Sequence, residues 1–129
     1  MATGRVSEYA RIVLAGVRLA NGAAALLAPR FLVRRLEVSP ETQGAAVYVF
    51  RLFGIRTVLI GLELVLPSSD AHHGALRRGL LIHASDTTAA VLAGWRGHLP
   101  RRAAATTAAI SLGNTLLAAV ALATWQDAD

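Results

Sequence analysis

The sequence predicts an all-α integral membrane protein, a four-helix bundle with a short amphipathic segment at the membrane interface after the first helix. Hydrophobic residues make up 54% of the chain and charged residues 16%, against about 25% charged in ordinary soluble domains. The 129 residues suit one transmembrane domain, 1–129. Residues 103–124 carry no charge on any face, whereas a helix of a soluble bundle would show a polar stripe.

The first half of the chain predicts two long helices separated by the interfacial segment. The first helix is expected at about 6–28, because Pro29 stops it. Charged and aliphatic residues occupy different faces of 30–38, which is typical of a helix lying along the interface. The run 39–41 (Ser-Pro-Glu) is a good helix start. A second helix from there to Leu66 is long enough at ~1.5 Å per residue to cross a ~30 Å hydrocarbon layer.

The second half predicts two more long helices and a polar tail. The run 68–70 (Ser-Ser-Asp) forms a turn, and the apolar part of the third helix is expected at 79–95. A turn at 97–100 leads to a fourth helix at 101–125, and 126–129 is the tail. All Tyr and Trp residues lie near helix ends, where their rings favour the membrane boundary: Tyr9, Tyr48, Trp95 and Trp125. We therefore expect a multi-pass protein of the cell membrane.

The net charge of +5 comes from arginines that cluster at the ends of the apolar stretches. This position favours contact with the headgroups of membrane lipid, and we do not expect nucleic acid as a partner. The absence of cysteine excludes disulfides, thiolate metal sites and cysteine catalysis. There is no phosphate loop, nucleophile elbow or zinc motif, so we expect neither a cofactor nor a metal.

Each predicted helix has a polar or charged residue near its middle, which is the main functional signal. A charge at mid-depth of a bilayer costs at least ~2.5–3.5 kcal/mol and is rarely without a role. Further polar residues follow at helical spacing and keep the same face. The predicted ligand-binding residues are Arg18, Asn21, Arg51, Arg56, Ser111 and Asn114. The predicted catalytic residues, if the protein is an enzyme, are Asp86, His83 and Glu63.

The leading hypothesis is a midplane site for a small, largely apolar molecule with an anionic or polar head. Arg18 and Arg56 would hold the head, and the acids Asp86 and Glu63 would orient these arginines. Counting Arg51, three arginines face two acids, and the excess of positive charge favours an anionic or strongly polar ligand. Alternatively, Arg51 extends to the headgroups and removes that excess. Asn21, Ser111 and Asn114 would add hydrogen bonds.

Two other functions stay open on the sequence. In the first, Asp86 with His83 acts as general acid or base in an intramembrane cyclase or isomerase of an apolar substrate. In the second, the polar layer only fixes helix packing in a structural or accessory protein. A transporter would need a homo-oligomer, since four short helices leave little room for alternating access. Asp70, His72 and His73 do not suit a metal, because adjacent histidines point to different sides of a helix.

Four short motifs give the chain a family resemblance: Arg18, 28–30 (Ala-Pro-Arg), 51–56 (Arg-Leu-Phe-Gly-Ile-Arg) and 85–86 (Ser-Asp). Over residues 10–125 the sequence resembles a bacterial domain-of-unknown-function family of small four-helix membrane proteins, similar in outline to the DoxX-like proteins. The resemblance implies the fold and the membrane location. It implies no catalytic residues, because the family has no settled activity.

Overall fold

The computed structural model describes residues 2–66 and 69–125, and the all-α prediction is confirmed over them. Four helices are 21 to 27 residues long, and short segments connect them. The helical elements are α1 (Ala2–Leu27), α2 (Pro29–Arg35), the 3-10 turn η1 (Pro40–Thr42), α3 (Gln43–Glu63), α4 (Ser69–Trp95) and α5 (Arg101–Ala123). Ser68 of the predicted turn and the tail 126–129 lie outside the described residues.

Prolines and two left-handed residues set the element boundaries. Pro29 and Pro40 open α2 and η1, where a missing backbone N–H leaves no helical bond unmade. α4 ends in a Schellman motif, in which Gly97 has a φ of 72° and His98 N–H donates to the carbonyl of Ala93 at 2.8 Å. α2 ends in the same motif, but its left-handed position holds Glu37, with a φ of 53°.

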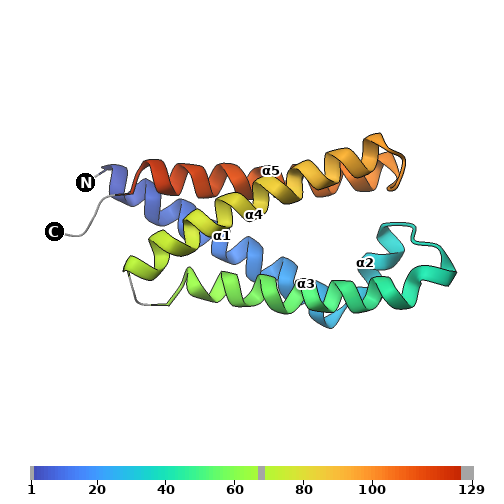
Figure 1. The fold of residues 1–129 in the computed structure, drawn as a ribbon. Helices are drawn as coiled ribbons and strands as arrows, with labels where there is room; N and C mark the ends of the chain where they lie inside the picture. Colours follow the sequence, from blue (N-terminus) through green and yellow to red (C-terminus); the bar gives the residue numbers. More distant parts are fainter. Residues whose placement is uncertain (1, 67–68, 126–129) are drawn as a thin grey trace.

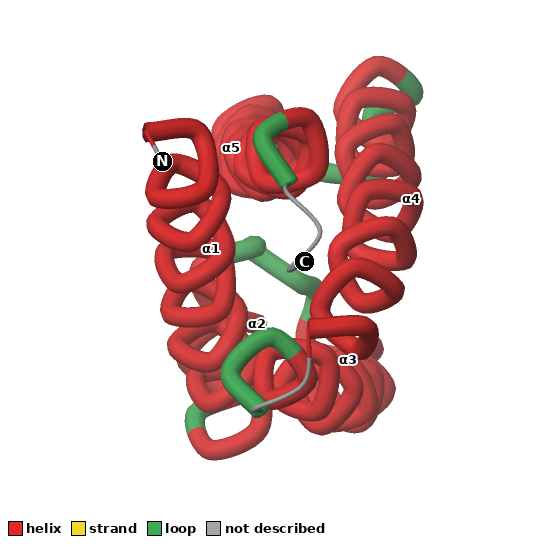
Figure 2. Tube along the Cα trace, turned by 90° about the vertical axis from the view of Figure 1, so that its left-hand side faces the viewer, coloured by secondary structure: helices red, strands yellow, loops and turns green. Residues whose placement is uncertain are grey.

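The four long helices alternate in direction and differ in how closely they pack (Figure 1). α1 packs against α3 on one side and α5 on the other, and α4 packs along the length of α5. α3 and α4 touch little. α2 lies against α3 at the end of the bundle opposite the start of α1. Seen along the bundle, α1, α5, α4 and α3 surround a common centre (Figure 2).

Small residues hold the α1–α3 and α4–α5 pairs close together. A Cβ atom added to Gly54 of α3 would lie 2.6 Å from the backbone nitrogen of Leu26 and 2.8 Å from the carbonyl oxygen of Gly22, both in α1. A Cβ on Gly94 of α4 would lie 2.5 Å from Cβ of Ala104 in α5. The close approach of the helices in these two pairs requires glycine or alanine at the contact, as is general at close helix crossings.

The distribution of side chains is inverted relative to a soluble bundle. Large apolar side chains cover the outside, such as Trp95 at 83% and Leu81 at 73% exposed, whereas Arg18 is only 2% exposed. A small apolar core at one end of the bundle is built around Leu14, Leu64 and several alanines.

Within residues 2–66 and 69–125, three segments are long and apolar enough to cross a membrane: Gly4–Leu27, Pro40–Glu63 and Arg101–Ala123. α4 is not among them, although four membrane-crossing helices are expected from the sequence. The charged and histidine residues of α4, including Arg77, Arg78, His83 and Asp86, make it the most polar of the long helices.

We predict that Gly54→Ala lowers the free energy of unfolding by about 1–3 kcal/mol, because the new methyl group would overlap the backbone of α1. Gly16→Ala is the matched control, since a Cβ there meets nothing within 4 Å. The control should be neutral or stabilising by about 0.5–1 kcal/mol. Thermal unfolding of both purified variants measures the difference. Equal midpoints would contradict the close α1–α3 contact.

Candidate functional site

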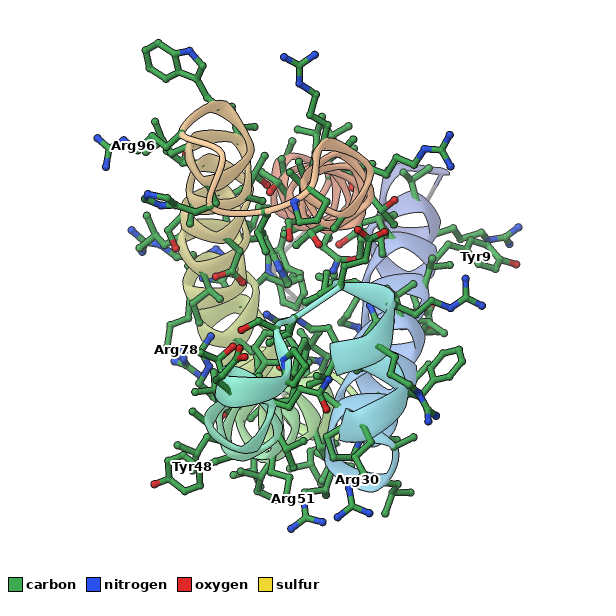
Figure 3. The ribbon with its side chains drawn as sticks, turned by 90° about the vertical axis from the view of Figure 1, so that its right-hand side faces the viewer. Tyr9, Arg30, Tyr48, Arg51, Arg78 and Arg96 are labelled. Carbon is green, nitrogen blue, oxygen red and sulfur yellow. The ribbon has the colours of Figure 1, made fainter. Side chains whose placement is uncertain are left out.

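A cavity of about 620 Å³ lies between the four long helices and reaches α2 at one end. Its polar lining comes mainly from the middle of the helices: Arg18, Asn21, Arg56, Thr57, His83, Asp86, Thr107, Ser111 and Asn114, with Thr42 at the α2 end. The rest of the lining is apolar and includes Leu32, Leu36, Val49, Phe53 and Leu99, from α2, the first half of α3 and the connection before α5. The cavity is therefore amphipathic along its length. Figure 3 shows the bundle from the α2 end.

Arg18 is the central residue of the polar part. Its Nε donates a hydrogen bond of 2.7 Å to Nε2 of His83, which joins α1 to α4. A guanidinium group has donors only, so Nε2 of His83 acts as the acceptor, and the neutral ring carries its proton on Nδ1. Nη1 of Arg18 is buried and has no hydrogen-bond partner among the described residues. It lies beside Gly79, where even an added Cβ would be 4.0 Å away.

Asp86 follows His83 by three residues and lines the same cavity, half-buried. Within the described ranges it forms no ion pair, so the expected pairing with Arg18 is not made. Ser111 and Asn114, also three residues apart, are buried on the α5 wall. Both predicted pairs thus face the cavity, because i, i+3 spacing keeps two side chains on one helix face.

The structure does not bring Glu63 to this cavity. Its Oε2 accepts a hydrogen bond of 2.6 Å from Nη2 of Arg78, and both side chains are exposed. The expected Arg56–Glu63 pairing is therefore not made. α4 starts next to the end of α3 (Figure 1) and presents Arg78 to Glu63 there. The spacing of seven correctly puts Arg56 and Glu63 on similar faces of α3, but it does not say which residue of another helix each one meets.

Arg51 also lies outside the cavity lining. It is exposed, and Figure 3 shows its side chain pointing away from the bundle. This placement matches the alternative in which Arg51 extends to the surroundings, and it removes Arg51 from the charge count of the site.

Arg56 lies at the boundary between the cavity and the outer surface of the bundle. It lines the cavity, yet its side chain is exposed at the surface of the bundle. Its guanidinium carbon is 6.0 Å from the ring centroid of Phe53, a distance compatible with a cation–π contact. No described residue forms an ion pair with it.

Several cavity residues carry no signal that singles them out in the sequence. Thr57 is buried next to Arg56, and Phe53 and Thr107 also line the cavity. Thr57 and Phe53 flank Arg56 at one and three residues, so the turn around a mid-helix arginine could have been searched for them. Leu36 and Leu99 belong to different connections, and only the tertiary structure brings them together.

Comparison with protein-family models, with curated proteins and with solved structures gives no match to this chain. The resemblance to the DoxX-like proteins is not tested by these comparisons and stays a prediction.

We predict that His83→Ala lowers the free energy of unfolding by about 2–3 kcal/mol, because it leaves Nε of the buried Arg18 without its acceptor. His83→Gln offers an amide oxygen and should recover part of this loss. His98→Ala, at an exposed position, is the control and should change little. Thermal unfolding measures all three variants. An equal effect of His83→Ala and His98→Ala would show that the Arg18–His83 bond does not support the fold.

Proposed function

We propose that the protein is a multi-pass membrane protein in which α1, α3, α4 and α5 all cross the bilayer. The inverted distribution of side chains supports this, since a soluble monomer rarely exposes so much contiguous apolar surface. In the apolar window of α3, only 17% of residues are buried inside the bundle. Lipid would cover the remainder of that surface.

α4 fits a membrane despite its polar residues, because of where they point. His83 and Asp86 line the interior cavity, and Arg78 is paired with Glu63 near the end of the bundle. Its outward positions from the middle of the helix onward include Leu81, Val91 and Leu92. Ionisable groups in membrane helices characteristically face the bundle interior in this way.

We propose further that the cavity binds a small, largely apolar molecule through an anionic or polar head. The observation that carries this proposal is the set of charged side chains in the cavity wall, Arg18, Arg56 and Asp86, in which neither arginine forms an ion pair with a described residue. Charged groups at mid-depth in a membrane bundle are costly and characteristically mark the site of a ligand or an ion. A volume of about 620 Å³ is within the range of small-molecule sites.

The amphipathic lining supports a definite orientation of this molecule. Its head would lie at mid-depth between Arg18, Arg56 and the α5 residues Ser111 and Asn114, with Asn21 as a further hydrogen-bonding group. Its apolar part would extend toward α2. Asp86 would balance part of the arginine charge. Glu63 takes no part, because it is engaged with Arg78.

The membrane proposal predicts how the protein fractionates. Washing membranes with alkaline carbonate or high salt should leave the protein in the pellet, and a mild detergent should release it. The physical reason is that apolar side chains around α1, α3 and α5 must stay out of water. Immunoblotting of the fractions measures this. Release by carbonate without detergent would contradict integral insertion.

The ligand proposal predicts a co-purified molecule. Native mass spectrometry of the protein in mild detergent should detect a discrete adduct of small mass. Asn114→Leu should lose most of the adduct, because it removes a buried polar group from the cavity wall. Arg51→Gln, outside the cavity, should retain it. Ordinary phospholipid adducts alone, equal in all three proteins, would count against the ligand site.

A further inference from the structure

Among the described residues, α3 and α4 are held together near one end. The Glu63–Arg78 ion pair joins the last residue of α3 to a residue in the first half of α4. From there α4 runs away from α3 toward its long contact with α5 (Figure 1). Glycine residues let α1 pack closely against α3 and α4 against α5. The described residues of α3 and α4 are not in such close contact along most of their length.

Arg56 lies on the face of α3 that borders this separation. It precedes Glu63 by seven residues, or about two helical turns, so both residues leave α3 in similar directions. Glu63 points toward α4, as its ion pair with Arg78 establishes. Arg56 therefore faces the gap between α3 and α4 at mid-length. This explains how it can line the cavity and still be exposed.

The charged groups lining the cavity do not balance. Among the described residues they are Arg18, Arg56 and Asp86, and His83 is neutral because its Nε2 accepts from Arg18. Two positive charges and one negative charge leave a sum of +1. An unbalanced charge is unfavourable at mid-depth in a membrane. One negative charge on a ligand would neutralise the set, whereas a neutral head would not.

We infer that the ligand is a single-chain amphiphile with one negative charge, such as a carboxylate, and that Arg56 binds this charge at the opening between α3 and α4. This inference rests on the proposed function and names the chemical class of its ligand. Arg18 donates to the same head from inside the cavity. The single apolar chain lies along Leu36, Val49 and Phe53 toward α2, in a volume suited to one small molecule.

The test compares dodecanoate with dodecan-1-ol, two probes with the same chain and different head charge. Binding of each to the full-length protein in nanodiscs is measured by isothermal titration calorimetry at pH 8, where the carboxylate is ionised. Wild-type protein should bind dodecanoate more tightly. Arg56→Gln should weaken dodecanoate binding by about tenfold or more and leave dodecan-1-ol binding unchanged.

Two further variants separate this effect from a general change in charge. Arg51→Gln removes the same charge from the same helix, but outside the cavity, and should leave both affinities unchanged. Asp86→Asn removes the one carboxylate among the described residues of the lining and should tighten dodecanoate binding. Thermal unfolding of each variant confirms that it is folded before its affinity is compared.

The outcomes also separate this inference from the proposed function. Equal binding of the two probes, with Arg56→Gln and Arg51→Gln behaving alike, would overturn the charge assignment and leave the amphiphile site standing. Binding of neither probe to the wild-type protein would overturn the inference as well. Native mass spectrometry of the co-purified adduct, and of its loss in Asn114→Leu, would then test the proposed function independently.

Discussion

The burial of the Arg18 guanidinium constrains the rest of the bundle. A charge removed from water must be given hydrogen bonds and room, and both come from α4: His83 supplies the acceptor, and Gly79 leaves space beside Nη1. The bond spans 65 residues of sequence. It fixes the rotation of α1 and α4 about their axes, so that Asn21 and Asp86 also face the centre. The polar interior follows from this one placement.

The glycine contacts decide where the empty space lies. Gly22 and Gly54 draw α1 and α3 together, and Gly94 and Ala104 do the same for α4 and α5. Two tight pairs joined along α1–α5 leave the α3–α4 side wide, and the Glu63–Arg78 ion pair holds this side near one end. Tight packing in two places therefore produces a cavity in a third, and the polar residues at mid-length line it.

The sequence predicts well where the helices lie and where along each helix the polar residues sit. It predicts less well which residues of different helices meet. Prolines and turns located the elements closely, and spacing of three brought His83 with Asp86, and Ser111 with Asn114, to one cavity. Both are local properties of a helix. The partner of Glu63 is not local, because it depends on how α3 and α4 are rotated and where they cross. Periodicity alone therefore could not distinguish Arg56 from Arg78 as that partner.

A purely structural polar layer would satisfy its own groups, and this argues for a ligand. Interhelical ion pairs of Arg18 and Arg56 with the two acids would have closed such a layer. Instead, one acid pairs outside the cavity with Arg78, and Nη1 of Arg18 has no partner among the described residues. Arg56 has the ring of Phe53 at a cation–π distance and forms no ion pair with a described residue. Excess positive charge and empty volume occur at the same place, and an anionic amphiphile would account for both.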